Sequence, residues 1–134
     1  MFQCSKHQMK SFLTFCDDKL QIISNDPKYN GFIVFIFHLL FQIISIFFLF
    51  FYPISITFYI VLSIWIIVLA SNFYFRGCIL TKLERYLWNT TSWFGPYYIF
   101  CNLDKWSNNK IKNMYICQII TLITILFVRI LFKY

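Results

Sequence analysis

Charged residues are scarce in this chain of 134 residues, and small residues are scarcer still. Only 13% of the residues are charged, whereas a soluble domain of this length carries nearer a quarter, because most of its surface faces water. Hydrophobic residues make up 60% of the chain and aromatic residues 23%. The charges are too few to cover a soluble surface, so the composition predicts a single domain that lies in a membrane.

The rare residue types share a property at the level of their codons. The chain has one Ala, three Gly, three Pro and three Arg, which G/C-rich codons encode, while Phe, Ile, Lys, Asn and Tyr fill nearly half of all positions. We infer that the coding genome is A/T-rich, as organelle genomes often are. The abundance of Phe therefore does not by itself mark a binding surface.

Acidic residues are the scarcest charges, and none falls in a long apolar run. The chain has five of them: Asp17, Asp18, Asp26, Glu84 and Asp104. An acid within a span is the usual mark of an intramembrane proton relay, so no relay of this kind is predicted. The glycines stand alone, without a phosphate-binding loop, and no nucleophile and base are paired by spacing. The sequence therefore predicts a protein that is not an enzyme.

Three apolar runs predict three transmembrane helices. The runs 31–52 and 54–75 contain 22 residues each and no charge, and each spans roughly 30 Å as a helix, which is the hydrocarbon thickness of a bilayer. Pro53 separates them, which favours a tight helical hairpin. A third run, 114–132, is interrupted only by Arg129, whose charge can extend to the nearby interface.

The positive charges predict how these spans are oriented. With three spans, the N-terminus and the loop 76–113 share one side, and that side holds ten of the twelve Lys and Arg residues. The positive-inside rule places them in the cytosol or in the mitochondrial matrix, with the C-terminus outside. Anionic lipid of the inner leaflet is the partner that this charge predicts, and nucleic acid is not.

Residues 1–30 are predicted to form an amphipathic docking arm at the membrane interface. Ser5 and Gln8 have the spacing of a capping box, and Asn25-Asp26-Pro27 is expected to end the helix. A cleavable mitochondrial leader is not expected, because Asp17 and Asp18 are acidic. Apolar side chains recur on one face of this helix at Met9, Phe12, Leu13, Cys16, Leu20 and Ile23.

The loop 76–113 is long and aromatic, which suits the level of the lipid headgroups. Thr81 and Glu84 match a second capping box, which predicts a short helix that opens there, and Gly95-Pro96 is expected to break it. The helix would place Leu83, Tyr86 and Leu87 on one face. The aromatic residues of the loop are Trp88, Trp93, Phe94, Tyr97, Tyr98, Phe100 and Trp106.

His38 is the one ionisable residue deep in a predicted span, and it is the candidate binding residue. Gln42 and Ser45 follow it on the same helix face. Buried polar groups in lipid face protein and find partners there, so we favour interhelical hydrogen bonding for this face, with the third span supplying Gln118, Thr121 and Thr124. The alternative is contact with a quinone or a haem. A bis-histidine haem would need a second membrane histidine, and His7 lies outside the spans.

The five cysteines are not expected to form disulfides or a metal site. They are Cys4, Cys16, Cys78, Cys101 and Cys117, they contain no Cys-x-x-Cys pair, and they fall on or near the predicted reducing side. Cys4, His7, Cys78 and Cys101 share that side, but the spacing of the second pair does not support zinc. The sequence predicts no cofactor and no metal.

Two short segments of the chain resemble segments of a known protein family. His38-Leu39-Leu40-Phe41 lies in the first apolar run, and Cys78-Ile79-Leu80-Thr81-Lys82-Leu83-Glu84, with Leu87, follows the second. Through them the chain resembles a bacterial family of small polytopic membrane proteins of uncharacterised function, in which Cys-Pro-Leu-Thr precedes a Leu-Glu and another Leu. Ile79 replaces the proline here. The resemblance implies a membrane fold and no activity.

In plan alone, three spans with the N-terminus inside and the C-terminus outside, the chain is similar to the membrane anchors of succinate dehydrogenase. Their haem histidine usually lies in the second span, whereas His38 lies in the first. No motif of those anchors is present in this chain.

The sequence as a whole predicts an all-α membrane protein with an N-terminal amphipathic interfacial helix (1–30) and a three-span domain (31–134). We expect a non-catalytic accessory subunit of a large inner-membrane assembly, specifically a mitochondrial respiratory-chain complex, with other membrane subunits as partners. The alternatives are a quinone- or haem-contacting anchor subunit that uses His38, Gln42 and Ser45, and a small membrane protein that acts alone.

Overall fold

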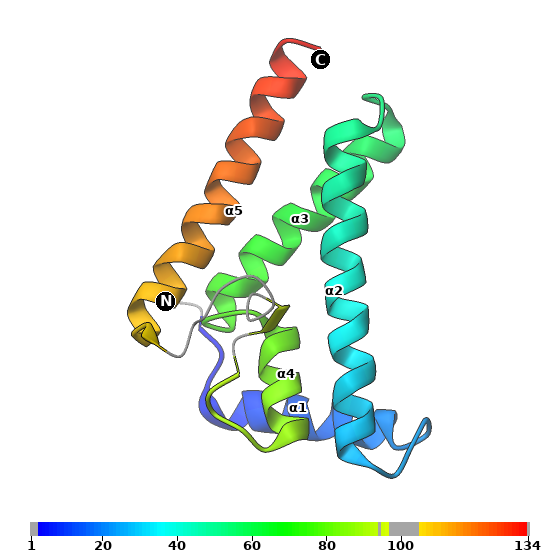
Figure 1. Ribbon diagram of the computed structural model, residues 1–134, viewed down its shortest axis with the longest axis vertical. Helices are drawn as coiled ribbons and strands as arrows, with labels where there is room; N and C mark the ends of the chain where they lie inside the picture. Colours follow the sequence, from blue (N-terminus) through cyan, green and yellow to red (C-terminus); the bar gives the residue numbers. More distant parts are fainter. Residues whose placement is uncertain (1–2, 94, 97–104, 134) are drawn as a thin grey trace.

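The computed structural model describes residues 3–93, 95–96 and 105–133, and in these residues it consists of helices without strands (Figure 1). The helices α2, α3 and α5 are long and apolar enough to cross a membrane. The predicted all-α fold with three spanning helices is therefore confirmed. The helices are α1 (Lys6–Leu20), α2 (Pro27–Phe51), α3 (Ile56–Tyr74), α4 (Ile79–Trp88) and α5 (Asn108–Leu131).

Two of the spanning helices begin earlier than the apolar runs predict. The helix α2 begins at Pro27, where the side chain of Asp26 accepts the Lys28 N–H at 2.9 Å. The helix α5 begins at Asn108, where the hydroxyl of Ser107 accepts the Lys110 N–H at 3.3 Å. A helix starts where a polar side chain satisfies its first N–H groups, whereas an apolar run marks only the part that suits lipid.

The predicted hairpin is confirmed, and Arg129 ties the third span to its tip. The chain turns between Phe51 and Ile56. The guanidinium of Arg129 donates to the carbonyls of Leu49 and Tyr52, the latter at 2.5 Å. These carbonyls lie at the C-terminal end of α2, where no N–H group of the helix follows that could donate to them. Arg129 therefore satisfies the open end of α2 from within the chain.

The capping box predicted for α1 is confirmed, and its apolar face is confirmed at Met9, Leu13, Cys16 and Leu20 but not at Phe12, which is 41% exposed. The Ser5 hydroxyl accepts from the Gln8 N–H, while the Gln8 side chain accepts from the Ser5 N–H. The prediction that Ile23 belongs to this face is wrong, because α1 ends at Leu20 and Ile23 is 58% exposed. The face packs against α2 and α4 in a cluster of Leu13, Val34, Leu83 and Leu87, with Met9, Cys16, Leu20 and Leu80 around it.

The capping box predicted at Thr81 is wrong. The helix α4 begins at Ile79 with Cys78 at the N-cap position, and it ends at Trp88, followed by Asn89 in a left-handed conformation with φ of 49°. Thr81 and Glu84 therefore lie inside the helix, and Glu84 is fully buried. Phe94, Tyr97, Tyr98, Phe100 and Cys101 of the predicted loop lie outside the described residues.

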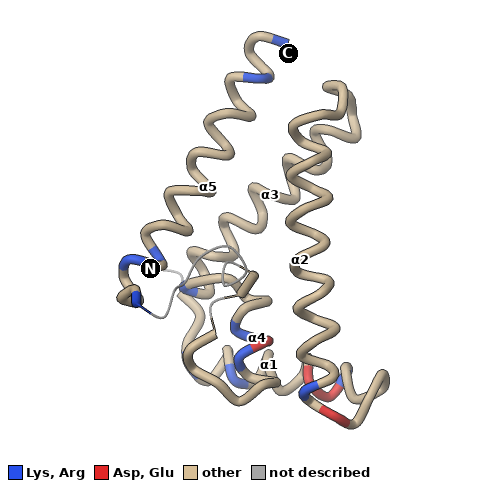
Figure 2. Tube along the Cα trace, viewed as in Figure 1, with Lys and Arg blue, Asp and Glu red and all other residues tan. Residues whose placement is uncertain are grey.

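The charges lie mostly at one end of the molecule (Figure 2). This charged end consists of α1, the start of α2, α4 and the start of α5, whereas Arg129 and Lys133 lie at the opposite end, near the turn between α2 and α3. The first part of α2 extends past the ends of α3 and α5 and has α1 and α4 beside it (Figure 1). The distribution agrees with the predicted sidedness, while the orientation in a particular membrane stays a prediction.

Candidate functional site

His38 lies at the junction of α2 and α4, bonded to a buried acid. Its side chain is 4% exposed, that of Glu84 is 0% exposed, and His38 Nδ1 lies 2.8 Å from Glu84 Oε1. The other carboxylate oxygen accepts the indole N–H of Trp93. Because a carboxylate accepts hydrogen bonds, His38 Nδ1 carries a proton and donates to Glu84, and Nε2 is the ring nitrogen that faces the other neighbours.

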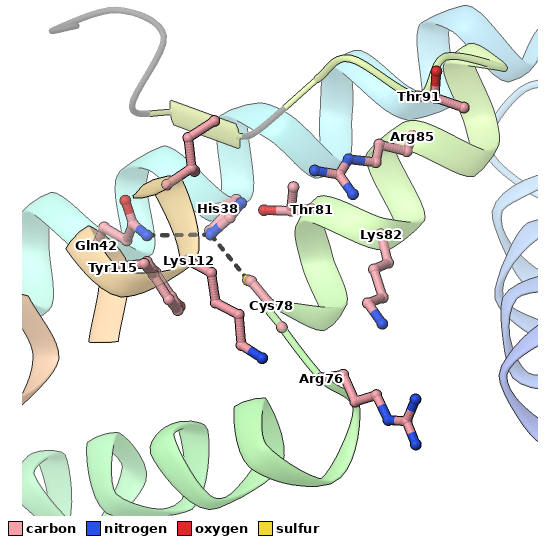
Figure 3. Close-up of a pocket in the computed structure, with 12 residues that line it drawn as sticks. His38, Gln42, Arg76, Cys78, Thr81, Lys82, Arg85, Thr91, Lys112 and Tyr115 are labelled. Carbon is pink, nitrogen blue, oxygen red and sulfur yellow. Dashed lines mark hydrogen bonds between the residues drawn. The ribbon is translucent and has the colours of Figure 1, made fainter. Parts of the chain in front are cut away.

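The second ring nitrogen of His38, Nε2, faces a thiol and an amide. Cys78 Sγ lies 3.6 Å from His38 Nε2, and the Gln42 amide nitrogen lies 3.2 Å from the same atom (Figure 3). Cys78 is half-buried at the N-terminus of α4. The three residues Cys78, His38 and Glu84, which we call the thiol cluster, thus form a series of thiol, imidazole and carboxylate.

The surroundings of Cys78 favour its thiolate. Burial by itself raises the pKa of the thiol, but the hydrogen bond and the charge of His38 and the donors of Thr81 outweigh burial, so the pKa of Cys78 lies below its ordinary value of 9.0. A helix N-terminus acts in the same direction, because its free N–H groups carry partial positive charge. Cys78 is therefore more nucleophilic near neutral pH than an ordinary buried cysteine.

A cationic pocket of about 260 Å³ opens beside the thiol cluster. His38, Gln42, Cys78 and Thr81 belong to its wall, as do four cations, Arg76, Lys82, Arg85 and Lys112 (Figure 3). None of its described lining residues is acidic. Burial, together with the charges of Arg85 and Arg76, lowers the pKa of Lys82. The pocket therefore holds excess positive charge and suits an anion.

An apolar groove of about 550 Å³ shares a lining residue with the cationic pocket. Gln42 lines both, and the groove continues along α2 to Phe51 with Trp65 of α3 in its wall. The indole N–H of Trp65 is buried and has no hydrogen-bond partner among the described residues. The remaining wall is supplied by Leu39, Ile43, Ile46, Phe47 and Phe50 of α2, by Pro96, and by Gln118, Ile119 and Leu122 of α5.

The backbone at Gly95 closes the site over Thr81. Gly95 has φ of 78°, and a Cβ atom added there would lie 2.8 Å from Thr81 Oγ1 and 3.6 Å from His38 Cε1. Only a residue without a side chain allows this close approach. The segment after α4 thereby covers the imidazole, with Trp93 fixed on Glu84.

Of the residues predicted for binding, His38 and Gln42 come together and Ser45 does not join them. The Ser45 hydroxyl donates to the carbonyls of its own helix at Phe41 and Gln42. The predicted partners on α5 are exposed, and Thr124 donates to the Ile120 carbonyl. Glu84, Gln42 and Cys78 occupy the His38 ring nitrogens instead. Contact of His38 with a haem or a quinone stays a prediction, and it would displace Gln42 and Cys78 from Nε2.

Cys78, Glu84 and Trp93 were not identified as site residues from the sequence. Cys78 and Glu84 lie 40 and 46 residues from His38, and Glu84 was interpreted as part of a capping box. One signal was available, since Leu80, Leu83, Glu84 and Leu87 share one helical face and an acid on an apolar face must find a buried partner. The segments of the resemblance also contain His38, Cys78 and Glu84.

No protein-family model, curated protein or solved structure matches this chain. The chemistry of the site follows from its own side chains. Among the described residues, no group of three or more His, Cys, Asp and Glu is placed to hold a metal ion. The thiol cluster has the parts of an activated nucleophile, and the cationic pocket and the apolar groove have the parts of a lipid site.

Proposed function

We propose that this integral membrane protein binds one anionic acyl lipid, with the phosphate-bearing headgroup in the cationic pocket and an acyl chain in the apolar groove. The observation that carries this proposal is that Gln42 lines both cavities, so that they lie side by side. A molecule that is anionic at one end and apolar at the other matches this pair of cavities. Anionic lipid was the partner predicted from the charge distribution of the sequence.

The side chains of the cationic pocket suit the phosphate of a lipid headgroup. Arg76 presents a planar guanidinium group, which can bind two phosphate oxygens at once, and Lys112 adds a point charge, whereas Arg85 Nε already donates to the Trp93 carbonyl. Basic pockets between spanning helices on the positive side of a membrane bind phosphorylated headgroups for this reason. Because the site is half-buried, salt screens its attraction less than it screens an exposed charge.

The apolar groove is about as long as the hydrocarbon region of one leaflet is thick. From Gln42 to Phe51 the groove follows α2 for roughly 13 Å, and half of a hydrocarbon core of about 30 Å is similar. Trp65 of α3 lies in the wall of the groove, and among the described residues its buried indole N–H has no hydrogen-bond partner.

The test measures lipid retention by the purified chain in nanodiscs with native mass spectrometry. We expect phosphatidylglycerol to be retained in preference to phosphatidylcholine with identical chains. The double variant Arg76→Gln/Lys112→Gln should weaken this retention roughly thirtyfold, because each cation contributes about 1 kcal/mol near an anionic headgroup.

The matched control is Lys6→Gln/Lys10→Gln, which removes the same charge from the exposed side of α1. We expect it to retain phosphatidylglycerol as the unaltered chain does. Equal retention of the two lipids by the unaltered chain, or equal loss in the control, would show that the cationic pocket does not select the lipid.

A second candidate function is the accessory subunit of a larger inner-membrane assembly, specifically a respiratory-chain complex. The observation that favours it is a strip of exposed polar side chains on α5, Cys117, Gln118 and Thr121. In a bilayer such residues normally face another helix. Native-gel sizing with mass spectrometry tests this function: companion subunits in a large band support it, and migration near 16.3 kDa plus detergent contradicts it.

A further inference from the structure

We propose that Cys78 is a nucleophile that accepts an acyl group from an ester or thioester whose leaving group carries a phosphate. This inference rests on the proposed lipid site, because the same pocket and groove would hold the substrate. The observation behind it is that the thiol lines the cationic pocket while its sulfur faces His38 Nε2 at 3.6 Å.

The order of the three groups is the order that nucleophilic catalysis needs. Glu84 bonds to His38 Nδ1, so the acceptor nitrogen Nε2 faces the thiol and can take its proton. The carboxylate also accepts from Trp93 and is fully buried, which holds its position. A histidine that served only to join α2 to α4 would not require a thiol on its second nitrogen, facing a cavity.

The N-terminus of α4 supplies donors for the negative charge that develops during acyl transfer. Cys78 occupies the N-cap position, with its sulfur beside the donors of Thr81. The first N–H groups of a helix have no helical acceptors, and they carry partial positive charge. They lie next to the sulfur, where the carbonyl oxygen of a bound acyl group would become an oxyanion.

The two cavities define the class of substrate. The cations Arg76 and Lys112 would hold a phosphate of the leaving group, and the apolar groove would hold the acyl chain. Gln42 lies at their junction and is 3.2 Å from the nitrogen that faces Cys78. The carbonyl carbon that links headgroup and chain would therefore lie near the sulfur. Phospholipids and long-chain acyl-coenzyme A share this chemistry.

The step is balanced without an oxidant or a second reactant. The Cys78 S–H bond breaks, His38 Nε2 takes the proton, and the sulfur forms a bond to the acyl carbon. The bond from this carbon to the leaving oxygen or sulfur then breaks, and the leaving atom takes the proton from His38. The products are an S-acyl thioester on Cys78 and the free phosphate-bearing alcohol or thiol. Water that attacks the thioester releases the fatty acid and restores the thiol.

The experiment uses the full chain in nanodiscs, with palmitoyl-coenzyme A and palmitoyl phosphatidylglycerol as separate probes. Peptide mass spectrometry locates the acyl adduct, and neutral hydroxylamine tests whether it is a thioester. We expect an adduct on Cys78 that hydroxylamine removes, formed on the order of 100-fold faster than in Glu84→Gln or His38→Gln. Cys78→Ser should lose this adduct, and Cys117→Ser should keep it. The probe that reacts identifies the source of the acyl group.

Noncovalent retention is measured on the same samples, so the two proposals can fail separately. Retained phosphatidylglycerol without an adduct on Cys78 overturns the nucleophile and leaves the lipid site. An adduct that forms at equal rates on Cys78 and Cys4, or at an unchanged rate in Glu84→Gln, also overturns it, since this would be uncatalysed acylation of thiols. Loss of both retention and adduct overturns both proposals.

Discussion

Replacing Glu84 with alanine should destabilise the charged end of the molecule by about 2–6 kcal/mol, because two donors lose their acceptor at a cost of about 1–3 kcal/mol each. Glu84 is fully buried, and its two oxygens accept from His38 and Trp93. The variant would leave the buried imidazole without this acceptor, and the shorter side chain would leave a cavity between α2 and α4. Thermal unfolding in detergent, followed by tryptophan fluorescence, measures the loss.

Glu84→Gln is the variant that separates folding from chemistry. The amide oxygen can accept from Trp93 and the amide nitrogen can donate to His38 Nδ1, so most of the packing and both contacts remain. The ring proton then moves to Nε2, which can no longer take the Cys78 proton. We expect near-normal unfolding and a fall in Cys78 reactivity on the order of 100-fold. Equal destabilisation by Gln and Ala, or unchanged reactivity with Gln, would contradict the assigned tautomer.

The second large effect concerns the pH dependence of Cys78 alkylation. Iodoacetamide reacts with the thiolate, so the rate rises with pH through the pKa of the thiol. Burial raises this pKa, but the lowering by His38 and Thr81 is larger than the rise from burial. The pKa of the thiol therefore lies below 9.0. The midpoint of the rate profile should therefore lie at a lower pH than that of an ordinary thiol.

His38→Gln should move this midpoint in the opposite direction. The variant removes the hydrogen bond and the charge that favour the thiolate, while burial, which disfavours it, remains. The midpoint should lie at a higher pH than in the unaltered chain, and the rate at pH 7 should fall, because a smaller fraction of the thiol is then ionised. Peptide mass spectrometry measures the rate, with Cys4 of the same digest as the reference. A profile that is unchanged in His38→Gln would show that His38 does not act on the thiol.

The spanning helices could be predicted from the sequence because lipid imposes a simple rule. The uncharged runs 31–52 and 54–75 must be helical to satisfy their own backbone groups, and Pro53 fixes the turn between them. The starts of the helices were less predictable. Asp26 and Ser107 decide them by capping, and both lie outside the apolar runs.

The thiol cluster could not be predicted from local pattern, because it joins residues that lie far apart in the chain. His38 meets Glu84 only when α4 folds back along α2. Thr81 and Glu84 also fit two different helix registers, and the spacing of a capping box gave the wrong one. The apolar positions Leu80, Leu83 and Leu87 favour the register observed, because they place Glu84 among buried side chains.

The most direct measurement of the central claim maps where a bound lipid lies. A phosphatidylglycerol with a photoreactive group near the end of one acyl chain is incorporated in nanodiscs, and the crosslinked residues are identified by peptide mass spectrometry. The account predicts that crosslinks concentrate along the apolar groove, at residues 43–51 of α2 and 118–122 of α5, and decrease in Arg76→Gln/Lys112→Gln. Crosslinks spread equally over exposed faces such as Ile66, Ile67 and Phe127, and unchanged in this variant, would contradict it.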